Sequence, residues 1–160
     1  MNEVHIPVLL SDVINMLSPK EGETYLDLTA GYGGHSDKIL EVTRNYNGAV
    51  LNDRDQNAID FLEAKYHEVK PKLMHDDFYS TALRLVESGI SFDMILADFG
   101  VSSPQLDKGE RGFSFAKEAR LDMRMDESQE LDAWTIVNKW SERKLADIFE
   151  QYAEERRGRA

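Results

Sequence analysis

The sequence predicts an α/β fold built on a parallel sheet, and three observations support this. In three consecutive stretches a short apolar strand is followed by a turn and an amphipathic helix, the order of a parallel sheet wound right-handedly. A fourth strand, residues 92–98, is nearly continuously apolar, as strands inside such sheets are. The first strand runs into a turn with three glycines, residues 31–34, which lets the backbone lie close to a ligand.

The composition is that of one soluble globular domain, with 160 residues, 41% hydrophobic and 31% charged. No apolar run reaches the roughly 18 residues that cross a bilayer, and the N-terminus does not resemble a signal peptide, so we expect a cytoplasmic protein without membrane contact. With no cysteine and no metal-ligand spacing among the four histidines, we expect no metal site. The net charge of −11 disfavours non-specific adhesion to nucleic acid but does not exclude a nucleic-acid substrate.

The N-terminal segment predicts an extended stretch followed by a short helix. Residues 5–10 are apolar and include a proline, so they should run extended. Ser11 or Asp12 then provides an N-cap for a helix with apolar residues at positions 13, 14 and 17. Residues 19–22 turn the chain toward the first strand.

The first strand and its glycine turn, residues 25–35, predict a ligand site at the start of the next helix. If that helix begins at about residues 34–36, its free N–H groups face the crevice at the strand's carboxyl end. A dinucleotide site requires G-x-G-x-x-G, in which Ser36 is a mismatch at the third glycine. An S-adenosylmethionine site instead places a carboxylate at the strand end, where Asp27 lies. Alternatively, Asp27 only caps a turn.

The second strand, residues 49–51, ends in a group of acidic residues. Asp53 lies 22 positions after Gly31, where a carboxylate at a strand tip binds the hydroxyl pair of a ribose. Asp55 fits the N-cap of the following helix, whose apolar face carries residues 58, 59, 62 and 66. The sequence therefore predicts that Asp53 binds a ribose and that Asp55 caps the helix.

The third strand, residues 71–74, is followed by an aromatic side chain at its tip. Phe78 is placed to stack on an adenine ring, although an aromatic at this position can equally belong to the core. The helix that follows has apolar residues at positions 83, 86 and 90 and should end at Gly89.

The fourth strand should be central and buried, which brings Asp98 out at the carboxyl edge beside the first strand and next to the ligand. Residues 99–125 then lack periodicity, which is typical of a functional or a disordered segment. Two helices are predicted at residues 132–138 and 141–152. Core packing is favoured over RNA stacking for Trp134 and Trp140.

These residues together resemble a known family, the bacterial 16S rRNA (cytosine-N4)-methyltransferases, RsmH or MraW. The resemblance covers essentially the whole chain, and its G-V-S-S-P-Q-L-D and L-D-M-R-M-D runs are highly specific. The runs that carry it are residues 5–10, 33–35, 53–55, 100–107, 110–115, 121–126 and 154–156.

The resemblance implies a Rossmann-like class I methyltransferase sheet, incomplete at about four strands and followed by the start of a helical insertion. It implies a domain 1–105 that binds S-adenosyl-L-methionine and a partial subdomain 106–160. The reaction it implies is methylation of the exocyclic N4 of a cytosine in the decoding region of 16S rRNA, within the small ribosomal subunit. The cofactor contacts it implies are Gly33, Gly34, His35, Asp53, Phe78, Asp98 and Gln105, with Asp98 also the catalytic candidate.

The chain departs from the family pattern mainly in length, since family members are considerably longer. Asn52 replaces a usually apolar residue, and residues 97–99 read Ala-Asp-Phe where Leu-Asp-Leu is usual. Missing strands would leave the fourth strand as an apolar edge, which favours a homodimer or other self-association. Two other functions stay open at this point: a truncated, non-catalytic module that binds cofactor or ribosome, and an NAD-linked oxidoreductase, which the glycine mismatch disfavours.

Overall fold

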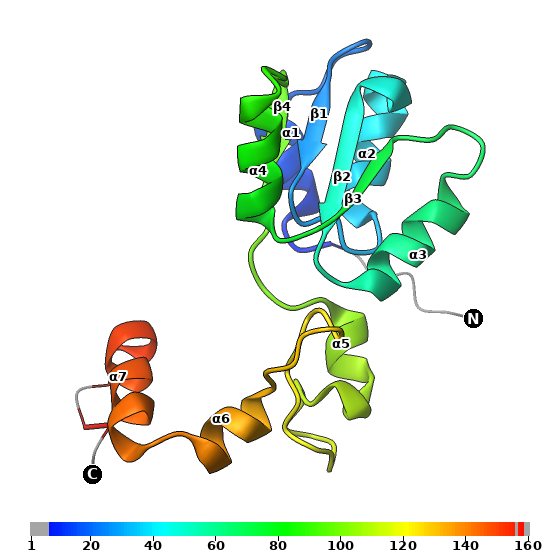
Figure 1. Cartoon of the computed structure of the whole chain (residues 1–160). Helices are drawn as coiled ribbons and strands as arrows, with labels where there is room; N and C mark the ends of the chain where they lie inside the picture. The colour runs from blue at the N-terminus through cyan, green and yellow to red at the C-terminus, as the bar shows by residue number, and fades with distance from the viewer. Residues whose placement is uncertain (1–6, 156, 159–160) are drawn as a thin grey trace. The chain divides into compact units, whose positions relative to one another are not determined.

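The computed structural model describes residues 7–155 and 157–158, and its contacts divide the chain into two compact units (Figure 1). Unit 1 is Met1–Gly100 and unit 2 is Val101–Ala160. The prediction of an extended segment at residues 5–10 is wrong for its described part, since Val8 and Leu9 form a turn and Leu10 begins the first helix, while residues 5 and 6 lie outside the described residues. Each unit is described by itself below.

Unit 1 contains a parallel sheet of four strands in the order β3-β2-β1-β4, which confirms the predicted fold. Leu26 of β1 lies opposite Val50 of β2 on one side and Ile95 of β4 on the other. The reversal of strand order at β1 is the topological switch point, where such sheets bind ligands at their carboxyl ends. The strands are β1 (Tyr25–Asp27), β2 (Ala49–Asp53), β3 (Lys72–His75) and β4 (Met94–Leu96).

Helices cover both faces of this sheet, because alternate residues of each short strand are apolar on opposite sides. Tyr25 and Leu51 belong to the larger core cluster, which also holds residues of the first three helices. Leu26 and Val50 point the other way and pack with Leu85 of the fourth helix. The helices of unit 1 are α1 (Leu10–Leu17), α2 (Gly34–Thr43), α3 (Gln56–Lys65) and α4 (Phe78–Glu87), with a 3₁₀ turn, η1 (Tyr46–Gly48).

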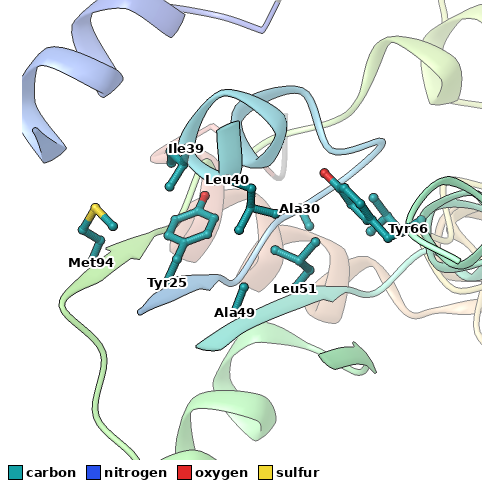
Figure 2. Close-up of a cluster of buried hydrophobic side chains, with 9 residues drawn as sticks. Tyr25, Ala30, Ile39, Leu40, Ala49, Leu51, Tyr66 and Met94 are labelled. Carbon is teal, nitrogen blue, oxygen red and sulfur yellow. The ribbon is translucent and has the colours of Figure 1, made fainter. Parts of the chain in front are cut away.

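The larger cluster fills the space between the sheet and α2 (Figure 2). Ile39 and Leu40 of α2 point down onto Tyr25 and Leu51, and all four side chains are at most 1% exposed. Burying an aliphatic side chain of this size contributes about 1.5–3 kcal/mol. The helix that follows the glycine turn is therefore held on the sheet mainly by this face.

The helix starts follow the sequence signals at two of three places. α2 begins at Gly34, as predicted, and α3 is capped by Asp55, whose Oδ1 accepts a hydrogen bond from Asn57 N at 3.0 Å. The predicted cap of α1 is wrong. That helix already begins at Leu10, after Leu9 in a left-handed conformation, so the candidate caps at residues 11 and 12 lie inside its first turn.

β4 is shorter and more exposed than predicted. Among the described residues it pairs with β1 alone, so it forms an edge of the sheet, as expected if further strands are missing, and not its centre, as the apolar run predicted. Met94 packs into the larger cluster, whereas Ile95 faces the other side and is 55% exposed. An apolar run indicates a strand that can be buried on both faces, but only the neighbouring elements decide whether it is.

Unit 2 consists of short helices joined by irregular chain that arginines hold in place. Arg111 is 4% exposed, and its Nη2 donates to the carbonyl oxygens of Arg124 at 3.0 Å and Met125 at 2.9 Å. Gly112 has φ 73°, and a Cβ there would lie 2.5 Å from the backbone nitrogen of Asp122. The aperiodic segment is thus ordered by hydrogen bonds. The helices are α5 (Ser103–Asp107), η2 (Gly109–Arg111), α6 (Ala133–Lys139) and α7 (Glu142–Ala153).

The prediction of core packing is wrong for Trp134. Its side chain is 38% exposed, and the Arg120 guanidinium lies over its ring at 4.9 Å. The described α6 has no buried residue. A stripe at helical spacing indicates an apolar face but not what covers it.

A buried amide on β2 ties together the carboxyl ends of three strands. Asn52 is 1% exposed, and its Nδ2 donates to the carbonyl oxygens of Leu28 at 3.0 Å and Asp76 at 3.1 Å. Its Oδ1 accepts a 2.7 Å hydrogen bond from the hydroxyl of Thr81 in α4. All hydrogen-bonding groups of this amide therefore have partners, which is what a buried polar side chain requires.

We expect the replacement Asn52→Leu to lower the free energy of unfolding by about 3 kcal/mol, since each buried group left without its partner costs about 1–3 kcal/mol. Urea unfolding followed by circular dichroism measures this. The control is Asn47→Leu at an exposed asparagine, which should change stability by less than about 0.5 kcal/mol. Equal, small losses in both variants would contradict the role given to Asn52.

Candidate functional site

Six of the seven predicted site residues lie in unit 1, at the carboxyl ends of its strands. Gly33, Gly34 and His35 surround the start of α2, and Asp53 ends β2. Phe78 begins α4, and Asp98 follows β4 by two residues. The seventh, Gln105, belongs to α5 in unit 2, where it is 5% exposed and its Oε1 accepts a hydrogen bond from Ser102 N at 3.0 Å.

The last two glycines of the turn, Gly33 and Gly34, are packed too closely against other residues to carry side chains. Gly33 is the N-cap of α2 with φ 79°, and a Cβ on it would approach Leu62 Cδ2 to 3.0 Å. A Cβ on Gly34 would lie 2.4 Å from Pro7 Cγ. Both glycines are therefore required by close packing, and the backbone N–H groups of the first turn of α2 lie at the carboxyl end of β1.

Asp53 is bound to the glycine turn directly. Its Oδ2 accepts a hydrogen bond from Gly31 N at 2.7 Å, and its Oδ1 accepts one from Asp55 N at 2.8 Å. Burial is the largest influence on this carboxyl group and raises its pKa, while the backbone hydrogen bonds oppose that rise. Because a carboxylate can accept about four hydrogen bonds, and the backbone at Gly31, Arg54 and Asp55 supplies three, Asp53 retains capacity for a hydroxyl group of a ligand.

Asp27 does not face the crevice, so the prediction that its carboxylate meets a ligand is wrong. It is 1% exposed, and its Oδ2 accepts hydrogen bonds from Tyr25 Oη at 2.8 Å and Ser36 Oγ at 2.6 Å. Its Oδ1 accepts a hydrogen bond from Thr29 N at 3.1 Å. Asp27 therefore caps the turn after β1, which was the alternative given for it. Burial raises the pKa of Asp27, and the hydrogen bonds from Ser36 and Tyr25 oppose this. Asp27 thus joins β1 to the first turn of α2 from below.

Asp98 is exposed at the edge of the sheet, and its backbone is tied to β1. Its N–H donates to the hydroxyl oxygen of Thr29 at 2.7 Å. The same Thr29 donates its N–H to Asp27, so one residue connects the buried carboxylate with the loop after β4. Asp98 therefore emerges beside the first strand, where the sequence placed it.

Phe78 lies against a second aromatic that the sequence analysis did not select. The ring centroids of Phe78 and Phe99 are 4.9 Å apart with an interplanar angle of 57°. Their side chains are 47% and 67% exposed. Phe78 is thus not a core residue, and the two rings form an exposed apolar surface at the carboxyl edge.

The glycine turn is also held from α3, through contacts that spacing alone did not reveal. Lys65 Nζ donates to the carbonyl oxygen of Tyr32 at 3.3 Å and forms an ion pair with Asp37. Tyr66 Oη donates to the other oxygen of Asp37 at 2.6 Å. The ring of His35 is used elsewhere, since its Nε2 lies 3.0 Å from the carbonyl oxygen of Val8 and carries the proton.

The carboxyl edge of this sheet carries several acidic residues. Asp53 ends β2, and Asp55, Asp76, Asp77 and Asp98 follow β2, β3 and β4 within two residues, with Asp76 paired to Arg84. Among residues 7–155 and 157–158, no three histidine or acidic side chains are grouped as metal ligands. Such an edge favours a cationic ligand over a polyphosphate. No helix in the described part of the chain is long and apolar enough to span a bilayer.

A parallel sheet with a glycine turn after β1 and a carboxylate at the tip of β2 defines a ligand-binding α/β domain of the Rossmann type. The profile of the MraW methylase family matches residues 2–160, so the chain belongs to that family.

Curated relatives agree with this assignment. The chain is 46% identical to the ribosomal RNA small subunit methyltransferase H of Lactobacillus johnsonii, over 95% of this chain and 51% of the relative. It is 49% identical to the protein of the same name from a Cyanothece species, over 96% of this chain and 51% of the relative. It is 46% identical to that of Mycoplasmopsis agalactiae, over 96% of this chain and 52% of the relative. The chain thus spans about half the length of the curated relatives it matches.

The buried carboxyl of Asp27 predicts a pH-dependent difference in stability. Its pKa is raised above the ordinary value of 3.8, so the stability it contributes is fully present below pH 3.8 and is lost as the pH rises through the raised value. Asp27→Asn cannot ionise. Relative to the wild type, we therefore expect this variant to gain stability as the pH is raised above about 4. Urea midpoints of both proteins across the pH range measure it, and a constant difference would contradict the assignment.

Proposed function

We propose that this chain carries the methyl-donor site of an S-adenosyl-L-methionine-dependent methyltransferase. The enzyme's target is the exocyclic N4 of a cytosine in the decoding region of 16S rRNA. The observation that carries the proposal is the hydrogen bond from Gly31 N to Asp53, which joins the glycine turn to the ribose-binding position. Family membership supports methyl transfer, and the relatives' printed names support ribosomal RNA as the substrate. The reaction takes place in the cytoplasm, where ribosomes are assembled.

The residues at this edge fit S-adenosylmethionine better than a dinucleotide. Asp53 lies at the tip of β2, where its carboxylate can accept a ribose hydroxyl, and close packing at Gly33 and Gly34 fixes the backbone at the start of α2. Asp98 adds negative charge opposite a ligand that carries an ammonium and a sulfonium. A pyrophosphate would meet the same carboxylates and be repelled.

When bound, S-adenosylmethionine supplies an electrophilic methyl group, and the chain's task is to prepare the acceptor. The exocyclic amine of cytosine is a weak nucleophile, because its lone pair is delocalised into the ring. A hydrogen bond from that amine to Asp98 restores lone-pair character. Holding the two reactants in line provides the rest of the acceleration. The cytosine must leave its stack to reach the edge of the sheet.

The cofactor assignment is tested by calorimetry with S-adenosylhomocysteine, the demethylated product. We expect saturable binding that weakens at least about tenfold in Asp53→Ala, since charge-assisted hydrogen bonding to the ribose is lost. Asp60→Ala, at an exposed aspartate of α3, is the matched control and should bind like the wild type. NAD binding tighter than binding of S-adenosylhomocysteine would overturn the proposal.

The role of Asp98 is tested by methyl incorporation into small ribosomal subunits that lack the modification. In single-turnover reactions at saturating donor, Asp98→Asn should lower the rate about 100-fold, the size of loss typical for one well-placed polar group at a reaction centre. Its affinity for S-adenosylhomocysteine should fall by no more than about threefold. Parallel losses in rate and affinity would make Asp98 a donor-binding residue only.

A further inference from the structure

We propose that Phe99 is a second adenine-binding residue, which forms one aromatic corner with Phe78 at the carboxyl edge of the sheet. The inference rests on the proposed function, because it assigns the base of an adenosyl ligand to this corner. Phe78 is an adenine candidate from the sequence, whereas Phe99 has no assigned role. The geometry of the pair and its surroundings carry the argument.

The rings of Phe78 and Phe99 contact each other, and both remain exposed. Their centroids lie 4.9 Å apart at an interplanar angle of 57°, which is a favourable tilted contact. Despite this contact Phe99 is 67% exposed and Phe78 is 47% exposed. Neither side chain belongs to the two core clusters of unit 1. Large apolar rings left open beside a ligand site are typical of a binding surface rather than of the core.

The backbone on either side of Phe78 is held by hydrogen bonds. Asn52 donates to the carbonyl oxygen of Asp76, two residues before it, at 3.1 Å. Asp77 caps α4 by accepting hydrogen bonds from Ser80 N at 2.9 Å and from the Ser80 hydroxyl at 2.7 Å. The ring therefore starts a helix whose first turn is already ordered, and little entropy is lost when a ligand stacks on it.

The backbone next to Phe99 is held by a hydrogen bond to the loop after β1. The residue before it, Asp98, is bound through its N–H to the Thr29 hydroxyl at 2.7 Å. Thr29 is itself bound to the buried Asp27. The corner is thus assembled from chain segments after β3 and after β4, and both are held to β1 or β2 in unit 1.

The charges beside the two rings favour an uncharged ring over an anionic group. Asp77 and Asp98 directly precede Phe78 and Phe99 in sequence, whereas Asp76 is paired with Arg84. An anionic group would be repelled here, whereas an uncharged heteroaromatic base gains stacking and edge contacts with both rings. Adenine of an adenosyl donor has this chemistry, and Asp53 at the tip of β2 is the ribose anchor on the same edge.

Calorimetric titration of the chain with S-adenosylhomocysteine, and competition by adenosine, test the proposal. Phe99→Leu keeps an apolar side chain but removes the ring, so the affinity for both ligands should fall by the same factor, about fivefold or more. Phe99→Tyr keeps the ring and should stay within about twofold of the wild type. Tyr79→Leu removes an aromatic of similar exposure, 68%, next to Phe78, and should bind like the wild type.

Three results would overturn the inference. Unchanged affinity of Phe99→Leu, beside normal binding by the wild type, removes Phe99 from the site and leaves the proposed function standing. A loss for S-adenosylhomocysteine without a loss for adenosine means that Phe99 acts on the loop and not on the base. Absence of S-adenosylhomocysteine binding by the wild type itself removes the proposed function, and this inference with it.

Discussion

The carboxylate of Asp27 is the constraint on which the candidate site depends. It is buried at 1% exposure, and it accepts hydrogen bonds from β1, from the loop after β1 and from the first turn of α2. A buried charge is costly unless it is well partnered, so this carboxylate stabilises only the arrangement in which all its donors are present. The glycine turn between these donors is thereby closed into one shape. Its backbone is in place before any ligand arrives.

A second buried side chain performs the same function on the other half of the edge. Asn52 connects the carboxyl ends of β1 and β3 with α4, while Thr29 connects the Asp27 network with the backbone at Asp98. The backbone before Phe78 is therefore held by Asn52, and the backbone at Asp98 is held by Thr29. Binding residues on loops held by a rigid sheet are pre-organised, which reduces the entropy lost on binding.

The proposed reaction requires binding of a cationic donor and binding of RNA, and the charges of this chain favour the first. The edge of the sheet in unit 1 carries carboxylates suited to a cationic donor, and the whole chain has a net charge of −11. Two arginines of unit 2 are used internally, since Arg111 donates to backbone carbonyls and Arg124 donates to the Asp122 carboxylate. These cations order an irregular segment and are not available as a simple phosphate-binding patch. The described residues thus account better for the donor than for recruitment of RNA.

Sequence alone determined the parallel α/β fold, the start of α2, the cap of α3 and the positions of Asp53 and Asp98 at strand ends. These follow from periodicity and capping, which are local and can be read along the chain. It did not determine that Asp27 points inward, that Ile95 of β4 is 55% exposed, or that Phe78 meets Phe99. Each of these depends on which segments distant in sequence become neighbours. Asn52 was visible as a polar residue in an apolar strand, yet only the tertiary structure supplied the three partners that make its burial favourable.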